Sequence, residues 1–260
     1  LKSGLLAAES ESGLCKVICY SPNHSLTLPL MSLQAIDKVI ALWQDEYREL
    51  GGMKDINYVQ IFENKGSIMG CSNPHPHGQI WSQNSIPQEV QKKDYNQKKY
   101  WEENGSSLLA DYIKQELVAK ERVVLENNSF VVVVPYWAVW PYETMIIPKR
   151  HLSSITELNP VEVSRYSEIL KDLTIKYDNL FETSFPYSAG IHQAPTNNND
   201  NQHWHWHMSF YPPLLRSAEV KKFMVGYEMF ANAQRDITAE QAAASLRALS
   251  TTHYSKQNKA

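Results

Sequence analysis

Two histidines and a glutamine alternate with proline and glycine in the run Asn73-Pro-His-Pro-His-Gly-Gln79. Side chains alternate between the two faces of an extended segment, so His75, His77 and Gln79 are expected to share one face. A neutral imidazole is a competent nucleophile toward phosphorus near pH 7, and a backbone carbonyl can fix its other nitrogen. A glutamine beside it can donate an N–H to a phosphate oxygen. The pattern therefore favours phosphoryl-group chemistry in which one of these histidines is the covalent nucleophile.

Two glycines accompany this run. Gly78 would let a nucleotide approach the backbone closely, and Gly70 would do the same just before the run. Short patterns also match by chance, so a polar loop with two surface histidines is the alternative. The residues on either side of the run decide between these interpretations.

A second cluster, His203-Trp-His-Trp-His207, also places three imidazoles on one face of an extended segment. Neighbouring same-face residues of a strand lie about 7 Å apart, too far to converge on one metal ion unless the strand bends. We therefore expect His203 and His205 to pack as polar structural residues beside Trp204 and Trp206. A bend would leave His205 open as a substitute metal ligand.

The composition is that of a globular protein with a sizeable core. The 260 residues are 43% hydrophobic and 20% charged, which fits one large domain or two fused halves. The net charge of −3, from 25 basic and 28 acidic residues, argues against nucleic acid or a membrane surface as partner. No apolar run approaches the roughly 20 residues of a membrane helix, and the first residues lack a signal-peptide pattern. We expect a cytoplasmic protein.

Cys15, Cys19 and Cys71 are an odd number of cysteines and too few for a disulfide framework, which agrees with a reducing compartment. Cys15 and Cys19 lie in a predicted strand, where thiols act as small apolar residues. The sequence begins at Leu1 shortly before that strand. We expect the natural amino terminus to lie upstream.

Hydrophobic periodicity defines the elements of the first half. Apolar residues at helical spacing predict a long helix over residues 32–50, ended by Gly51 and Gly52. Strands are predicted over residues 15–20 and 58–62. A charged helical stretch then follows the nucleophile run to about residue 120, with a loop near Gly105.

The second half repeats this order. Strands are predicted over residues 130–134 and 143–147, followed by a helix that starts at the capping box of Asn159 and reaches about residue 177. His24 and His151 lie 127 positions apart, and His75 and His203 lie 128 apart. These offsets predict a duplicated α+β unit with halves at residues 1–120 and 121–260. Two further helices are predicted near the end, over residues 218–233 and after Thr238.

The segment Gly70-Cys-Ser-Asn-Pro-His-Pro-His-Gly-Gln-Ile-Trp81 resembles the active-site signature of galactose-1-phosphate uridylyltransferases, a branch of the histidine triad superfamily. The resemblance covers nearly the whole chain in order. It extends to Phe62-Glu-Asn-Lys-Gly66, Val134-Pro-Tyr-Trp137, Lys176-Tyr-Asp-Asn-Leu-Phe181, Ser184-Phe-Pro-Tyr-Ser188, Tyr211-Pro-Pro-Leu-Leu-Arg-Ser217 and Lys222-Phe-Met-Val-Gly-Tyr-Glu-Met229.

The resemblance implies a fold and a reaction. The fold is a duplicated histidine-triad-like unit, an antiparallel sheet with helices packed on it. The reaction is a ping-pong exchange of UMP between UDP-glucose and galactose 1-phosphate in the Leloir pathway of galactose metabolism. It proceeds through a uridylyl-histidine intermediate, with UDP-galactose and the hexose 1-phosphates as partners.

The resemblance also assigns roles to single residues. His77 matches the nucleophile and Gln79 the residue that hydrogen-bonds the transferred phosphoryl group. The remaining substrate-binding positions lie near that phosphate or, in the family, come from the neighbouring subunit of a homodimer to contact the hexose phosphate. The former are Asn64, Gly70 and Ser72, and the latter are Lys222, Tyr227, Glu228 and Gln234. The run 222–229 is predicted to be an amphipathic helix with Phe223, Met224 and Tyr227 packed inward.

The implied metal sites are incomplete in this sequence. The family's structural zinc has two cysteines and two histidines that match His24 and His75, but no Cys-x-x-Cys lies upstream. A turn is the alternative role for His24. A second family site, described with iron or zinc, uses one glutamate and three histidines. Its positions fall on Lys93, His192, His207 and Ser209, so we expect iron or zinc to be weak or absent there.

Two other functions stay open. One is a nucleotidyl phosphorylase or adenylyltransferase of the same superfamily, since residues upstream of Leu1 would set the choice of base. The other is a non-catalytic metal-binding or scaffold homologue. Because that upstream segment would also enclose the uridine, we expect the 260-residue chain to fold but to transfer UMP and bind zinc only in traces.

Overall fold

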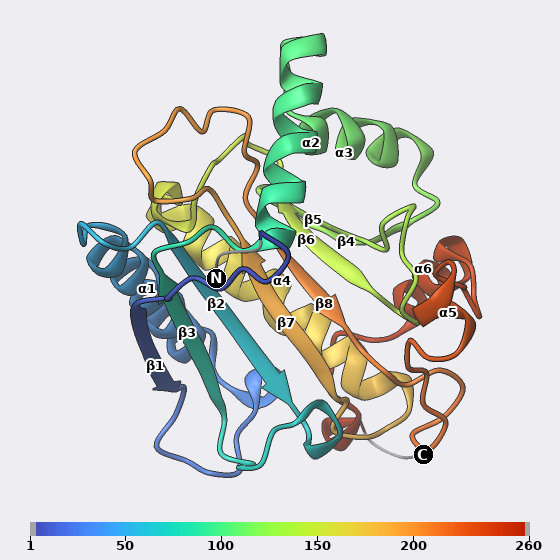
Figure 1. The fold of residues 1–260 in the computed structure, drawn as a ribbon. Helices are drawn as coiled ribbons and strands as arrows, with labels where there is room; N and C mark the ends of the chain where they lie inside the picture. The colour runs from blue at the N-terminus through green and yellow to red at the C-terminus, as the bar shows by residue number, and fades with distance from the viewer. Residues whose placement is uncertain (1–3, 258–260) are drawn as a thin grey trace.

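The computed structural model describes residues 4–257 and shows one antiparallel sheet of eight strands with helices packed on it (Figure 1). The strands are β1 Gly13–Cys19, β2 Tyr58–Lys65, β3 His77–Gln83, β4 Val123–Glu126, β5 Phe130–Val133, β6 Thr144–Pro148, β7 Tyr187–His192 and β8 His207–Tyr211. Their order across the sheet is β1-β3-β2-β7-β8-β6-β5-β4, and each neighbouring pair is antiparallel. The predicted α+β class is confirmed.

The helices of residues 4–257 differ widely in length. The α-helices are α1 Leu33–Gly51, α2 Gln88–Asn104, α3 Leu108–Ala119, α4 Pro160–Leu180, α5 Tyr227–Phe230 and α6 Ala239–Ala248. The 3-10 helices are η1 Leu28–Leu30, η2 Ser67–Met69, η3 Ile155–Glu157 and η4 Tyr254–Lys256.

The same order of elements occurs twice along the chain. The first series is β1-η1-α1-β2-β3 and the second is β6-η3-α4-β7-β8. The two sets of three strands meet in the middle of the sheet, where β2 pairs with β7 and Asn64 lies opposite Ser188. The predicted duplication is confirmed by this repeat. The proposed boundary between residues 120 and 121 falls between α3 and β4, and the division into halves there stays a prediction.

Helix α1 forms because local signals and burial agree. The Ser32 hydroxyl caps it by accepting the Ala35 N–H at 3.2 Å. One face is buried against the sheet and α4, and each large apolar side chain buried there contributes about 1.5–3 kcal/mol. That face consists of Ile36, Val39, Ile40, Trp43, Tyr47 and Leu50.

Helix α4 begins at the predicted capping box. Asn159 accepts the Glu162 N–H at 3.0 Å, and the Glu162 carboxylate accepts the Asn159 N–H at 3.0 Å. Arg150 binds both oxygens of that carboxylate, at 2.8 and 2.7 Å. The helix continues three residues beyond the predicted end, to Leu180.

The sheet is covered on both faces where β5 lies. Phe130 and Val132 join the core beneath α1 and α4, whereas Val131 and Val133 pack against α3 on the other face. The alternating side chains of β5 therefore belong to two apolar layers, one on each face of the sheet, as expected for a strand buried on both sides.

Two predicted elements are wrong. The helix over residues 218–233 shrinks to the four residues of α5, since Gly226 has φ +55° and interrupts helical geometry. Phe223 and Tyr227 are 42% and 59% exposed rather than packed inward. The extended segment at 203–207 is a strand only from His207, where β8 begins. Within residues 4–257 the model has no helix that is both long and apolar enough to cross a membrane.

Candidate active site

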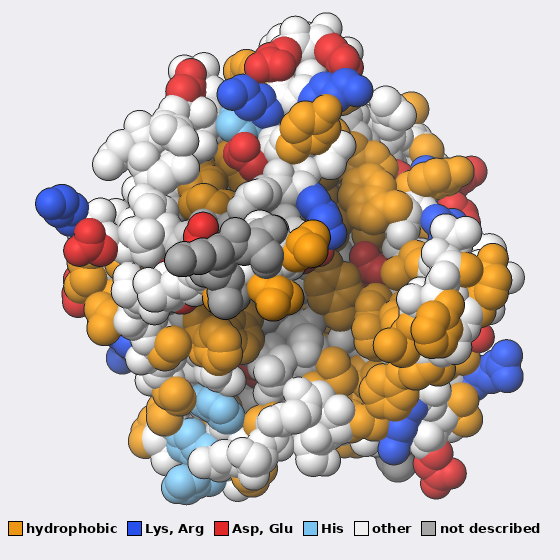
Figure 2. Space-filling view, viewed as in Figure 1, with side chains coloured by type: hydrophobic (Ala, Val, Ile, Leu, Met, Phe, Trp, Pro, Cys, Tyr) orange, Lys and Arg blue, Asp and Glu red, His pale blue; other side chains and the backbone are white. Residues whose placement is uncertain are grey.

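A cavity of about 380 Å³ opens where β2 ends and β3 begins. The β2–β3 loop, the residue before η1 and the α4–β7 connection supply its walls. In Figure 2, histidine side chains gather at the lower left of the visible face, where β3 begins in Figure 1. The lining residues are Thr27, Glu63, Asn64, Lys65, Gly66, Ser67, Cys71, Ser72, Pro74, His75, Pro76, His77 and Ser184.

His77 is the first residue of β3 and is half-buried. Its Nδ1 lies 2.7 Å from the carbonyl oxygen of His75. A carbonyl only accepts hydrogen bonds, so Nδ1 carries the hydrogen and Nε2 keeps the lone pair. The backbone thus fixes the tautomer in which Nε2 is the nucleophilic atom.

Gln79 follows two positions along β3, on the same, less buried face as His77. Trp81 Nε1–H donates to Gln79 Oε1 at 3.2 Å. Because that contact uses the amide oxygen, the amide NH₂ is oriented as a donor. Gln79 itself is not among the residues that line the cavity.

The glycines of the run have steric roles. A Cβ on Gly78 would lie 2.2 Å from the Tyr20 hydroxyl oxygen and 3.1 Å from the Phe62 carbonyl oxygen. The expectation that Gly78 admits a nucleotide is therefore wrong, since Tyr20 fills that side. Gly70 has φ +79° and ends η2, so the turn into the run requires glycine there.

Asn64 and Ser72, which the resemblance assigns to positions near the transferred phosphate, both line the cavity. The Ser188 hydroxyl donates to Asn64 Oδ1 at 2.6 Å across the β2–β7 pair. That contact uses the amide oxygen and leaves the Asn64 NH₂ group as a donor. The cavity wall therefore offers amide and hydroxyl groups suited to phosphate oxygens.

Sequence reasoning missed two charged residues of the wall, Glu63 and Lys65. Lys65 forms a buried ion pair with Asp178 at 2.8 Å, and His253 Nε2 lies 3.3 Å from the other oxygen of Asp178. Burial raises the pKa of Glu63 to about 7, against the opposing effects of Lys65 and of a 3.2 Å hydrogen bond from Tyr187. The sequence signals were the alternation of these charged residues in β2 and their place in the run Phe62-Glu-Asn-Lys-Gly66.

His24 and His75 converge as a pair. Their Nδ1 atoms lie 2.7 Å apart and their rings meet edge to face. The two imidazoles suit zinc, but residues 4–257 contain no group of three or more His, Cys, Asp or Glu placed to hold a metal ion. His75 lies outside β3, so its ring turns to His24 instead of continuing the row of His77 and Gln79.

The four predicted hexose-phosphate residues do not reach this cavity within the chain. Lys222 pairs with Glu228 and, at 3.2 Å, with Asp236. Tyr227 and Gln234 are exposed. The structure therefore places this set apart from His77.

The second histidine cluster is held by protein groups. His203 Nε2 lies 2.7 Å from Asp94. His205 bonds the Ser107 hydroxyl through Nδ1 at 2.8 Å and the Pro148 carbonyl through Nε2 at 3.0 Å. Both ring nitrogens of His205 are used, so it cannot substitute as a metal ligand. Burial lowers the pKa of His205 to about 4 and keeps it neutral.

The strand positions correct the offsets drawn from the sequence. His207 begins β8 as His77 begins β3, and His207 Nδ1 lies 2.9 Å from the His205 carbonyl oxygen. The structural counterpart of His75 is therefore His205 rather than His203. Gln79 corresponds in the same way to Ser209.

The positions assigned to the second metal site do lie together. His192 and His207 are paired across β7 and β8 with ring centroids 4.8 Å apart. Lys93 Nζ lies 2.9 Å from His192 Nδ1, and Ser209 follows on the same strand face as His207. A hydroxyl and an ammonium in place of two ligands do not fit a metal ion.

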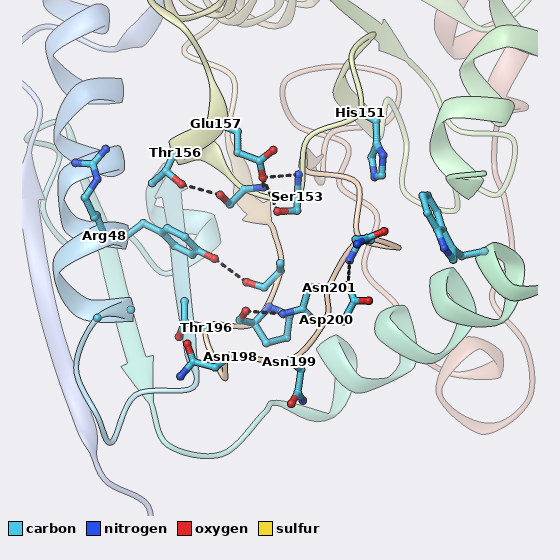
Figure 3. A pocket seen from close by; sticks show the side chains of 18 residues that line it. Arg48, His151, Ser153, Thr156, Glu157, Thr196, Asn198, Asn199, Asp200 and Asn201 are labelled. Atoms are coloured by element: carbon cyan, nitrogen blue, oxygen red, sulfur yellow. Dashed lines mark hydrogen bonds between the residues drawn. The ribbon is translucent and has the colours of Figure 1, made fainter. Parts of the chain in front are cut away.

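A larger cavity of about 690 Å³ occupies the corresponding place in the second half (Figure 3). The β7–β8 loop, the residues around η3 and the end of α1 line it. His151 Nε2 there lies 2.8 Å from the Trp204 carbonyl oxygen, and Glu157 accepts N–H bonds from Ser153 and Ser154. His207, the structural counterpart of His77, is not among the residues that line this cavity.

Comparisons with known proteins give a consistent picture. The model of the galactose-1-phosphate uridyl transferase N-terminal domain matches residues 2–87, and that of the C-terminal domain matches residues 89–258. The chain is 55% identical to galactose-1-phosphate uridylyltransferase of Haemophilus influenzae, over 98% of this chain and 72% of that protein. It is 54% identical to the enzyme of Schizosaccharomyces pombe, over 96% and 69%.

Two solved structures share the fold. A uridylyltransferase superposes with a TM-score of 0.84 at 29% identity, covering 90% of this chain and 74% of that one. An ADP-glucose phosphorylase from Arabidopsis thaliana with bound ADP-glucose superposes with a TM-score of 0.82 at 27% identity, covering 92% and 74%.

Proposed function

The chain belongs to the galactose-1-phosphate uridylyltransferase family of nucleotidyltransferases, and we propose that it exchanges UMP between UDP-glucose and galactose 1-phosphate in galactose metabolism. The observation that carries the proposal is the contact between His77 Nδ1 and the His75 carbonyl. It leaves Nε2 as an in-plane lone pair at the wall of a polar cavity.

In the first half-reaction, His77 Nε2 attacks the α-phosphorus of UDP-glucose. A P–N bond forms, the P–O bond to the β-phosphate breaks, and glucose 1-phosphate leaves with the bonding electron pair. In the second half-reaction, a phosphate oxygen of galactose 1-phosphate attacks the same phosphorus. The P–N bond breaks, and UDP-galactose and neutral His77 result. The His75 carbonyl stabilises the cationic imidazole of the intermediate, since it accepts the Nδ1 hydrogen throughout.

The neighbouring groups support this chemistry by binding phosphate oxygens. Gln79, with its amide oxygen held by Trp81, would donate N–H to the transferred phosphoryl group. Asn64 and Ser72 would bind the same group from the cavity wall, while Gly70 shapes the turn that precedes Ser72. An amide cannot protonate a leaving group, which favours transfer over hydrolysis.

The hexose phosphate would be bound between two copies of the chain in a homodimer. Lys222, Tyr227, Glu228 and Gln234 lie away from the cavity of their own subunit, so a partner would have to supply them. Hydrophobic side chains crowd the right of Figure 2, where α5 and α6 lie in Figure 1. That partner would also cover the exposed apolar residues of segment 223–230. They are Phe223, Val225, Tyr227, Met229 and Phe230.

Zinc is the metal that would suit the His24–His75 pair. Two neutral imidazoles supply half of a tetrahedral set, and the pair lies directly before the nucleophile. A bound zinc would fix the Asn73–His75 part of the loop and so orient the His75 carbonyl that holds His77.

Adenylyl transfer is the second candidate, because the ADP-glucose phosphorylase has the same fold at a TM-score of 0.82. The higher identity to uridylyltransferases, at 55%, favours uridine. Incubation with UDP-glucose or ADP-glucose in turn, followed by intact-mass measurement, separates the two by the mass of the adduct.

The same measurement tests the mechanism. In the full-length protein, we expect UDP-glucose to give a UMP adduct that galactose 1-phosphate removes, and His77→Gly to give none. His151→Ala changes a histidine of the corresponding cavity and should keep the adduct. No adduct with either nucleotide sugar at saturation would reject a covalent mechanism and favour a non-catalytic homologue.

A further inference from the structure

Helix α2 is docked on the second histidine cluster by polar side chains of one face. Asp94 accepts from His203 Nε2 at 2.7 Å and from Trp204 Nε1 at 2.6 Å. Gln97 Oε1 accepts the His205 N–H at 3.1 Å. Each contact joins the helix to the segment that leads into β8. His203, Trp204 and His205 therefore form the surface on which α2 packs.

Lys93 lies on the same face of α2 and extends this docking to the sheet. Its Nζ lies 2.9 Å from Nδ1 and 3.0 Å from Nε2 of His192, the last residue of β7. His207 stacks on His192 with an interplanar angle of 28°. The buried carboxylate of Glu143, the residue directly before β6, also interacts electrostatically with Lys93. A positive charge thus sits among two imidazoles and a carboxylate.

An ammonium group only donates hydrogen bonds, so whichever His192 ring nitrogen accepts from Lys93 must present the lone pair of the neutral imidazole. A metal ion at His192 would use that same lone pair. Lys93 and a divalent cation therefore exclude each other, both by space and by like charge. Ser209 offers only a neutral hydroxyl where the resemblance implies a third histidine.

We infer that the Lys93 ammonium replaces the second metal ion of the family, and is this chain's own cation bridging α2 to the His192–His207 pair. The bridge needs no metal ion. This inference concerns the assembly of the fold and is independent of the proposed uridylyl transfer.

Zinc content tests the exclusion. Each protein is stripped with EDTA, incubated with ZnCl₂, desalted and measured by mass spectrometry for zinc per chain. The wild type and His207→Ala should bind equal amounts, since any zinc at His24 and His75 is common to both. Ser209→His should also match the wild type, because Lys93 still excludes the ion. Lys93→Glu with Ser209→His should gain about one zinc per chain.

Lys92→Glu is the matched control, because this neighbouring lysine is exposed and pairs with Glu89 on the helix surface. It should gain no zinc. The inference is overturned if zinc in the wild type falls on His207→Ala, if Ser209→His alone gains zinc, or if the folded double variant gains none. Should the double variant fail to fold, the first two comparisons still decide.

Hydrogen exchange tests the bridge itself. Lys93→Met should speed amide exchange in α2 by about tenfold or more, the usual worth of a charged hydrogen bond. Lys92→Met should leave the exchange unchanged. Equal exchange in both variants would show that Lys93 does not hold the helix.

Discussion

Glu63 should make the protein less stable as pH rises from about 4.5 to about 7. The residue is 6% exposed, and its carboxyl group accepts a hydrogen bond from the Tyr187 hydroxyl at 3.2 Å. Lys65 lies near, but its ammonium is engaged by Asp178. Desolvation therefore outweighs the favourable charge and raises the pKa of Glu63 from 4.5 to about 7.

The sign follows from proton binding. Between pH 4.5 and 7 the unfolded chain has released the Glu63 proton and the folded chain retains it, so a rise in pH favours unfolding. A difference of about 2.5 pKa units corresponds to about 3 kcal/mol, since one unit is about 1.4 kcal/mol. The loss is complete near pH 7 and constant above it.

Glu63→Gln removes the ionisation and keeps the shape. We expect the variant to exceed the wild type in free energy of unfolding by about 3 kcal/mol at pH 8 and to match it within about 1 kcal/mol at pH 4. Urea titrations followed by circular dichroism at pH 4, 5, 6, 7 and 8 measure the difference. Glu102→Gln, on the exposed surface of α2, is the control. A difference between variant and wild type that is constant from pH 4 to 8 would refute the reasoning.

Three further substitutions test packing, capping and charge pairing by the same titrations. Gly78→Ala should cost about 1–3 kcal/mol by collision with the Tyr20 hydroxyl, and Tyr20→Phe should recover part of that cost; full stability of the single variant contradicts the packing. Asn159→Ala should cost about 1 kcal/mol and Asn159→Asp much less, whereas equal losses would argue against the cap. Asp178→Asn should cost about 3–5 kcal/mol by leaving Lys65 charged and buried, and Lys65→Met combined with Asp178→Leu should recover most of it.

Local signals predicted the two long helices well. The apolar stripe and Ser32 cap fixed α1, and the Asn159 capping box fixed the start of α4. Sheet order was beyond such signals, because β2 and β7 pair across more than a hundred residues. The repeat of elements suggested two similar halves, but only pairing in space shows that they share one sheet.

The residues of the candidate site were likewise predicted only in part. His77, Asn64 and Ser72 were found because they belong to short motifs around the β2–β3 loop. Glu63 and Lys65 were missed because their importance lies in contacts with Tyr187 and Asp178, from the other half. Burial of a charged group is a property of the assembled fold and leaves little trace in a linear pattern.

The error over residues 218–233 has a physical cause. Apolar residues at helical spacing indicate a buried face only if the chain itself provides something to cover it. Here Gly226 breaks the helix, and Phe230 is 89% exposed. The apolar side chains at this spacing stay exposed, because no other part of residues 4–257 covers them.

The two histidine clusters have the same local backbone geometry but different surroundings. His77 and His207 each begin a strand and each bond the carbonyl two residues earlier through Nδ1. At β3 the ring faces a cavity, so its Nε2 is available to a substrate. At β8, α2 lies over the strand and Lys93 approaches the stacked His192. The backbone fixes the tautomer in both places, but only the imidazoles at β8 have a lysine of α2 beside them.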